Sequence, residues 1–104
     1  MTFPLSASDD TTRLLDAVRD SIRLQIILLL GKSKALNVTE IAGHFRISRP
    51  AISHHLKVLK DAGIVRSEKT GQEIYYRVDV NRVVSGLRHI ADLIENCCPS
   101  EQTK

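Results

Sequence analysis

Apolar residues recur every three or four positions through the first third of the chain, which is the spacing of one face of an α-helix. Two helices are predicted there. The first follows a flexible tail of residues 1–8, with Ser8 and the two aspartates after it as N-terminal caps. The second covers residues 22–30, begins after Asp20–Ser21 and ends at Gly31. Because residues 22–30 are almost wholly apolar, we expect this helix at the centre of the core.

Two shorter helices separated by a tight turn are predicted next, over residues 39–45 and 49–62. Either Asn37 or Thr39 can cap the first of them, and Ser48 can cap the second. Two short helices joined by a three-residue turn are typical of a helix-turn-helix.

The period then changes. Residues 64–67 and 73–78 favour two strands joined by a turn over residues 68–72, so a β-hairpin is predicted. The helical period returns over residues 80–96 and Pro99 ends it. The predicted fold is therefore mainly α with a β-hairpin wing (α+β), a winged helix-turn-helix in the order ααααββα.

The chain has 104 residues and is expected to form one domain over residues 9–96, followed by a C-terminal tail of residues 97–104. Its formal net charge is +3, which suits an anionic partner without proving one. The longest apolar run, residues 26–30, is far too short to span a membrane, and no signal-peptide pattern opens the chain. We therefore expect a cytoplasmic protein without a membrane partner.

Residues 49–62 divide into two faces when each residue advances the helix by 100°. Ile52, Leu56 and Leu59 fall on one side, and His55 leans toward that side, where we expect it to have an internal partner. The other side combines cations with hydrogen-bonding side chains, which suits the major groove of DNA. An ordinary solvated basic face is the alternative interpretation, but the hairpin favours DNA. The predicted contacts are Ser48, Arg49, Ser53, His54, Lys57, Lys60 and, at the wing tip, Lys69.

Arg66 and Arg77 also lie on the predicted hairpin. Two interpretations of these arginines stay open. They either contact DNA or brace the hairpin against Glu68 and Glu73.

Residues 47–65 are very similar to the recognition helix of ArsR/SmtB-type repressors. The wing at residues 71–77 and the segment at residues 20–26 resemble theirs too, with Ser21 in place of a proline. The resemblance covers about residues 14–94. It implies that Ser48, Arg49, Ser53 and His54 lie in the major groove, with Lys69 on the wing. It also implies a homodimer, joined by the first and last helices, that represses an operon until an effector releases it.

Apolar faces at both ends of the predicted domain suit that dimer interface independently of the resemblance. The predicted interface residues are Leu14, Leu15, Val18, Val83, Leu87, Ile90 and Ile94.

Two departures from the family bear on the effector. Many of its metal sensors carry a Cys-x-Cys where this chain has Asn37 and Thr39, and neutral oxygens cannot replace thiolates for a soft metal. Other members bind a metal at a second site, and of its ligands this chain keeps only the aspartate. We therefore predict no metal site and no cofactor. The positions that match this second site are Asp79, Asn81, Asp92 and Glu95.

Cys97 and Cys98 are the only cysteines. Because adjacent Cα atoms lie only about 3.8 Å apart, a disulfide between them would be strained. The pair either senses a trivalent arsenical or an oxidant, or consists of two small residues at a helix end. A repressor with no effector is the constitutive alternative.

The sequence thus predicts a DNA-binding regulator, most simply a homodimeric repressor. It would read a palindromic operator with residues 49–62 and the wing at 64–78, and its targets could include its own promoter. The rival is a winged-helix module that binds protein, whose affinity would depend little on salt. An enzyme is not expected, because Ser53, His54 and Asp61 lie along an exposed helix face without an oxyanion site.

Overall fold

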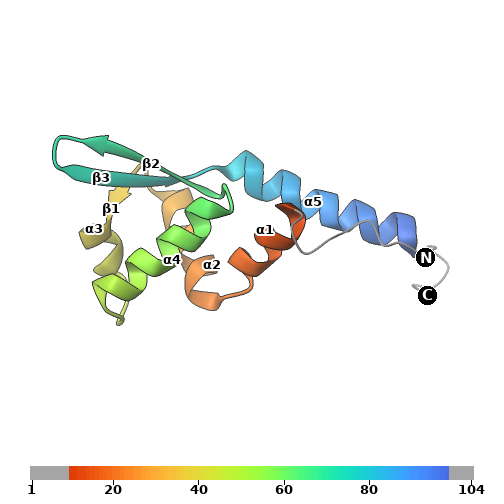
Figure 1. The fold of residues 1–104 in the computed structure, drawn as a ribbon, viewed down its shortest axis with the longest axis horizontal. Coiled ribbons are helices and arrows are strands. Elements are labelled where there is room, and N and C mark those ends of the chain that lie inside the picture. Colours follow the sequence, from red (N-terminus) through yellow and green to blue (C-terminus); the bar gives the residue numbers. More distant parts are fainter. Residues whose placement is uncertain (1–9, 99–104) are drawn as a thin grey trace.

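A computed structural model describes residues 10–98 of the chain (Figure 1). The predicted cap at Ser8 and stop at Pro99 lie outside the described residues. The predicted order of elements is confirmed, with one addition, the short strand β1. The elements are α1 (Asp10–Val18), α2 (Ser21–Lys32), β1 (Leu36–Asn37), α3 (Val38–Ala42), α4 (Arg49–Asp61), β2 (Val65–Thr70), β3 (Glu73–Val78) and α5 (Val80–Cys97).

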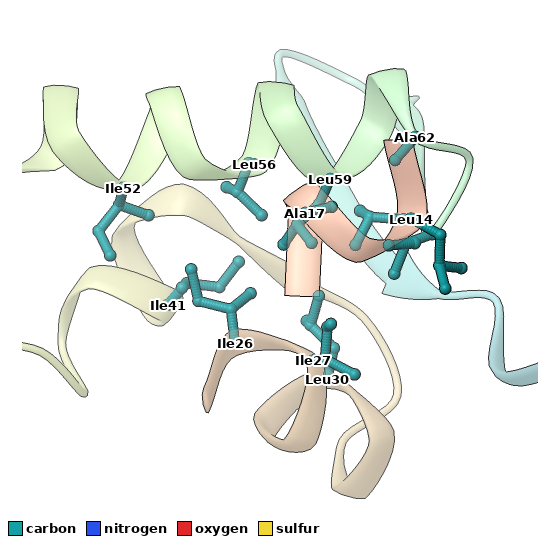
Figure 2. Close-up of a cluster of buried hydrophobic side chains, with 12 residues drawn as sticks. Leu14, Ala17, Ile26, Ile27, Leu30, Ile41, Ile52, Leu56, Leu59 and Ala62 are labelled. Carbon is teal, nitrogen blue, oxygen red and sulfur yellow. The ribbon is translucent and has the colours of Figure 1, made fainter. Parts of the chain in front are cut away.

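One hydrophobic core joins the first four helices to the start of the hairpin. Figure 2 shows Leu14 and Ala17 of α1 converging with side chains of α2, α3 and α4. Ile26 and Leu30 lie among them, so the prediction that the second helix occupies the centre of the core is confirmed. Each such aliphatic side chain stabilises the fold by roughly 1.5–3 kcal/mol when it leaves water.

The start of α2 agrees with the sequence prediction and its end does not. Asp20 caps the helix, since its Oδ1 accepts from the backbone N–H groups of Ile22 (2.8 Å) and Arg23 (3.1 Å). The helix continues through Gly31 to Lys32. Gly31 lacks the positive φ of a helix-ending glycine, so its residue type alone was a misleading stop signal.

The third helix is shorter than the predicted residues 39–45. Asn37 caps it, and a reciprocal bond from the Asn37 backbone to Glu40 completes a capping box. Beyond Ala42 the chain continues in i→i+3 hydrogen-bonded turns, with the Phe45 N–H donating to the Ala42 carbonyl oxygen at 3.1 Å. Phe45 still packs against the core, so the apolar spacing that predicts a helix up to this residue reflects its burial.

The strands form one antiparallel sheet in the order β1-β3-β2. β1 pairs Leu36 with Tyr76 and has only two residues, too few for any alternation to mark it in the sequence. The hairpin turn is tighter than the predicted residues 68–72. β2 extends to Thr70, so that Lys69 pairs with Ile74 inside the ladder and the turn is Gly71–Gln72. Gly71 has a φ of 65°, which suits a two-residue turn.

The last helix, α5, lies across α1 and projects beyond the rest of the described chain (Figure 1). Its close contact with α1 is at Gly86, because a Cβ there would lie 2.6 Å from Leu14 Cδ1. The helix continues through Cys97, the first residue assigned to the tail. Among the described residues, no helix is long and apolar enough to cross a membrane.

Candidate nucleic-acid interface

The division of α4 into two faces is confirmed. Ile52, Leu56 and Leu59 are buried in the core, whereas Ser53 and His54 are exposed. Ser48 caps the helix as predicted, with its Oγ accepting from the Ala51 N–H at 3.3 Å. Because α3 and α4 pack against each other, the buried side of α4 is fixed and its polar side faces solvent.

The cations along α4 differ in how they are held. Arg49 Nη2 donates to Thr39 Oγ1, so this guanidinium is placed against α3 at the start of the helix. Lys57 Nζ lies 3.5 Å from Asp61 Oδ2, and both side chains are largely exposed. An exposed pair of this kind contributes about 0–1 kcal/mol, so a phosphate can compete for Lys57. Lys60 is exposed on the same side.

The structure gives an internal partner for one of the two arginines of the wing. Arg66 and Arg77 lie directly opposite each other in the β2–β3 ladder, and both are exposed. Arg66 Nη2 pairs with Asp79 Oδ2 at 2.8 Å, so the expected bracing partners, Glu68 and Glu73, are wrong for Arg66. Asp79 also caps α5, and the pair therefore ties the wing to the start of that helix.

The carboxyl of Asp79 accepts from both the Arg66 guanidinium and the Arg82 backbone N–H. The backbone N–H of Arg82 and, less strongly, the guanidinium of Arg66 hold the pKa of Asp79 below its ordinary value, although desolvation opposes them. The charged Asp79 carboxylate therefore holds the wing to the start of α5. Among the described residues, no group of three or more His, Cys, Asp or Glu side chains is arranged to hold a metal ion.

His55 is half-buried, and the prediction that it has an internal partner is confirmed. Its Nδ1 lies 3.2 Å from Nη1 of Arg23 on α2. The sequence does not mark Arg23 as a partner of His55, because nothing in the local pattern joins two positions that are 32 residues apart. His54, its neighbour, points into solvent with its ring centroid 6.1 Å from that of His55.

The predicted dimer-interface residues differ in their exposure. Leu14 is 0% exposed and belongs to the core of a single chain, so its assignment to an interface is wrong. The physical reason is its contact with Gly86, which brings α5 directly over it. Val18, Val83 and Ile90 are half-buried against the core, whereas the remaining three are exposed, namely Leu15, Leu87 and Ile94.

Exposed apolar side chains form a stripe along α5. From Val80 to Ile94 its four members are separated by four, three and seven residues, which places them on one narrow face of the helix. At its N-terminal end the stripe borders a groove of about 390 Å³, lined from α2 by Ile27 and Leu28. Cys97 and Cys98 are exposed at the opposite end of the helix. The apolar stripe of α5 consists of Val80, Val84, Leu87 and Ile94.

Comparison with known proteins gives consistent relatives. Residues 20–67 match a family model described as a bacterial regulatory protein of the arsR family. The transcriptional repressor SdpR of Bacillus subtilis is 36% identical over 78 residues, which cover 75% of this chain and 86% of that protein. The HTH-type transcriptional repressor SmtB of Mycobacterium tuberculosis is 36% identical over 75 residues. Those residues cover 72% of this chain and 55% of that protein.

A solved structure extends the likeness to the fold. It is the homodimeric winged helix-turn-helix DNA-binding domain of a possible ArsR-family regulator from Mycobacterium bovis. It superposes with a TM-score of 0.67 at 28% identity and covers 88% of this chain and 91% of its own. The predicted fold class is confirmed by this likeness.

Proposed function

The chain belongs to the ArsR family of bacterial regulatory proteins, and we propose that it acts as a homodimeric repressor on a palindromic operator. Members of this family are DNA-binding transcriptional regulators and not enzymes. The observation that carries the proposal is the exposed face of α4. It combines hydrogen-bonding side chains with cations, and the first acidic residue on it is Asp61, at the end of the helix.

Each part of this surface has its own role in the proposal. Ser53 and His54, exposed in the middle of α4, read base edges in the major groove. Arg49, held by Thr39 at the start of the helix, contacts a base or a phosphate there. The remaining contacts position the helix on the phosphate backbone. They are Lys57, Lys60 and, on the wing, Lys69, whereas Ser48, the N-cap of α4, lies in the major groove beside Arg49.

The apolar stripe of α5 supports a second copy of this chain as its occupant. Its spacing of four, three and seven residues is that of helices that pack along their length. Leu15 of α1 is exposed and adds to the apolar surface of the chain. The winged helix-turn-helix domain from Mycobacterium bovis is homodimeric. In a dimer of this kind the two α4 helices enter successive major grooves about 34 Å apart.

Three effector alternatives follow from the cysteines. The first is constitutive repression without an effector, the second a trivalent arsenical on Cys97 and Cys98, and the third oxidation of these thiols. Both cysteines are exposed, which gives a reagent access. They lie together at the C-terminal end of α5 and the sequence has no third cysteine to complete a trithiolate site for arsenic, which favours the constitutive alternative.

Binding to duplex DNA from upstream of the chain's own gene tests the proposal. The affinity should fall steeply with salt, because neutralised phosphates release counterions. Replacing Lys57 and Lys60 with alanine should reduce the slope of log K against log[salt] by about one unit per removed phosphate contact. The matched control is Lys34→Ala, since Lys34 is equally a surface lysine but lies between α2 and β1.

Two results would contradict the proposal. A weak salt dependence, unchanged by the double substitution, would favour the rival module that binds protein through the apolar stripe of α5. Equal affinity for promoter and random duplexes would exclude sequence-specific repression of that promoter. Repeating the titration with a trivalent arsenical or a mild oxidant, on the wild type and on Cys97→Ser/Cys98→Ser, separates the effector alternatives.

A further inference from the structure

Arg23 connects three helices. Its Nε donates to the Ala17 carbonyl oxygen at 2.8 Å and its Nη2 to the Asp16 carbonyl oxygen at 3.1 Å, both at the end of α1. Its Nη1 lies 3.2 Å from His55 Nδ1 on α4. The side chain itself comes from the first turn of α2. One guanidinium therefore bridges α1 and the DNA-facing helix from a third element.

We propose that Arg23 and His55 are positioning residues that hold α4 at a fixed angle to α1, and so set the half-site spacing that the dimer accepts. The inference rests on the proposed function, because half-sites matter only for a dimer that reads a palindromic operator. It assigns a role in specificity to two side chains that lie behind the DNA-facing surface.

The end of α1 is a natural anchor for Arg23. Carbonyl groups in the last turn of a helix lack intrahelical partners, and the helix dipole places negative partial charge there. The guanidinium satisfies the carbonyls of Asp16 and Ala17 together. Because guanidinium is planar and its N–H groups point in fixed directions, two bonds to α1 determine where the third N–H points.

The backbone of Arg23 is fixed as well. Asp20 Oδ1 accepts from the Arg23 N–H at 3.1 Å as part of the cap of α2. The backbone N–H of Arg23 and, less strongly, that of Ile22 hold the pKa of the Asp20 carboxyl below its ordinary value, against the effect of desolvation. Both ends of the Arg23 side chain are thus restrained, which makes it a stiff connection between helices.

At the other end, the chemistry of the bond assigns a tautomer to His55. Arginine only donates hydrogen bonds, so Nδ1 of His55 accepts and the ring proton of the neutral form lies on Nε2. His55 stands between exposed His54 and buried Leu56 on α4. Any rotation of α4 about its axis that re-aims His54 also moves His55 away from Arg23.

The dimer converts this local restraint into a distance. If two copies meet along α5 with α1 packed beneath it, each α1 is fixed relative to the two-fold axis. The Arg23–His55 contact then fixes each α4 relative to α1, and with it the separation of the two recognition helices. Without the contact, α4 keeps its core packing through Ile52, Leu56 and Leu59 but loses one angular restraint.

The first measurement is the tautomer. Nitrogen-15 NMR of the imidazole rings at pH 8 should show Nδ1 of His55 unprotonated and hydrogen-bonded. Arg23→Gln should shift this resonance while leaving that of His89, which is exposed on α5, unchanged. A protonated Nδ1 in the wild type would overturn the contact itself, whatever the protein does with DNA.

The second measurement is spacing selectivity. An operator is selected from random duplexes by the wild type, and its half-sites are then moved together or apart by one and two base pairs. Arg23→Gln and His55→Leu should each lose about tenfold affinity for the selected spacing and respond less to its changes. Affinity for random DNA should change less than twofold. His55→Gln, which keeps an acceptor oxygen, should recover part of the selectivity.

Arg19→Gln is the matched control, because Arg19 pairs at the exposed surface with the carboxylate of Asp16, its Nε 3.5 Å from Oδ1, and does not reach α4. It should keep the wild-type spacing profile. A wild-type profile for both Arg23→Gln and His55→Leu would overturn the inference and leave the proposed function standing. A wild type that selects no operator would overturn the proposed function, and the spacing role with it, but not the tautomer. Thermal unfolding identifies a variant that fails to fold, in which case the substitution at the other end of the contact decides.

Discussion

Neighbouring side chains on α4 meet very different surroundings. Ile52 and Leu56 are buried, while Ser53 between them is exposed, because successive residues of a helix point about 100° apart. Function therefore has to be assigned residue by residue. A side chain that reads bases and one that contacts phosphate are distinguished by how their loss depends on DNA sequence.

We expect Ser53→Ala to weaken binding to the operator by roughly 1–3 kcal/mol while leaving random DNA nearly unaffected, since a base contact is lost. Lys57→Ala should weaken binding to both DNAs alike, because phosphate is common to them. Fluorescence anisotropy with operator and random duplexes at one salt concentration compares the two variants. Equal losses on both DNAs for Ser53→Ala would contradict its role as a base reader.

Asp20 provides a prediction about pH. Its pKa is lowered from an ordinary value of 3.8 by the backbone N–H of Arg23 and, less strongly, that of Ile22. A depressed carboxyl pKa stabilises the fold above the unfolded-state pKa, and this contribution is lost as pH falls through the folded-state pKa. Asp20→Asn keeps a capping oxygen but cannot titrate. The free energy of unfolding of the variant, from urea denaturation, should therefore approach that of the wild type as pH falls below about 4. A difference that is constant with pH would contradict the assignment.

Whole elements were predictable where packing and local period agree. Residues 49–62 show both faces of α4 because a buried helix side leaves a regular pattern, and the cap at Ser48 adds a local start signal. β1 has two residues and leaves no period, and Gly31 continues a helix that its residue type suggested would end. The Arg23–His55 contact depends on how α1, α2 and α4 pack, which no local pattern encodes.

Two glycines in helices give a test at the same scale. Gly31 has open space where a Cβ would lie and no positive φ, so Gly31→Ala should stabilise the fold by about 0.5–1 kcal/mol. At Gly86 the new Cβ would meet buried Leu14 at 2.6 Å, so Gly86→Ala should destabilise it by about 1–3 kcal/mol. Urea denaturation measures both. Equal stability of the two variants would mean that α5 does not pack against α1 as closely as the structure has it.

The whole molecule raises the question of what covers α5. Eighteen residues form this helix and only Gly86 among them is buried, whereas the four residues of the apolar stripe are 40–57% exposed in a single chain. Burying such apolar surface adds to the stability of a small domain, and exposed apolar patches of this kind mark interaction sites. Charge repulsion introduced into the middle of the stripe should therefore separate two copies, if a second copy is what covers it.

Leu87→Glu places a carboxylate at the centre of the apolar stripe of α5, where Leu87 is 44% exposed. In a dimer two such charges would be buried near the two-fold axis, so the variant should sediment as a monomer and bind operator at least tenfold more weakly. Ile74→Glu is the matched control, because Ile74 is 45% exposed but lies on the wing. It should keep the oligomeric state of the wild type. A Leu87→Glu protein that remains dimeric would move the interface off this stripe. A wild type that is monomeric at micromolar concentration would contradict the proposed dimer. It would favour a different protein as the partner that covers the stripe.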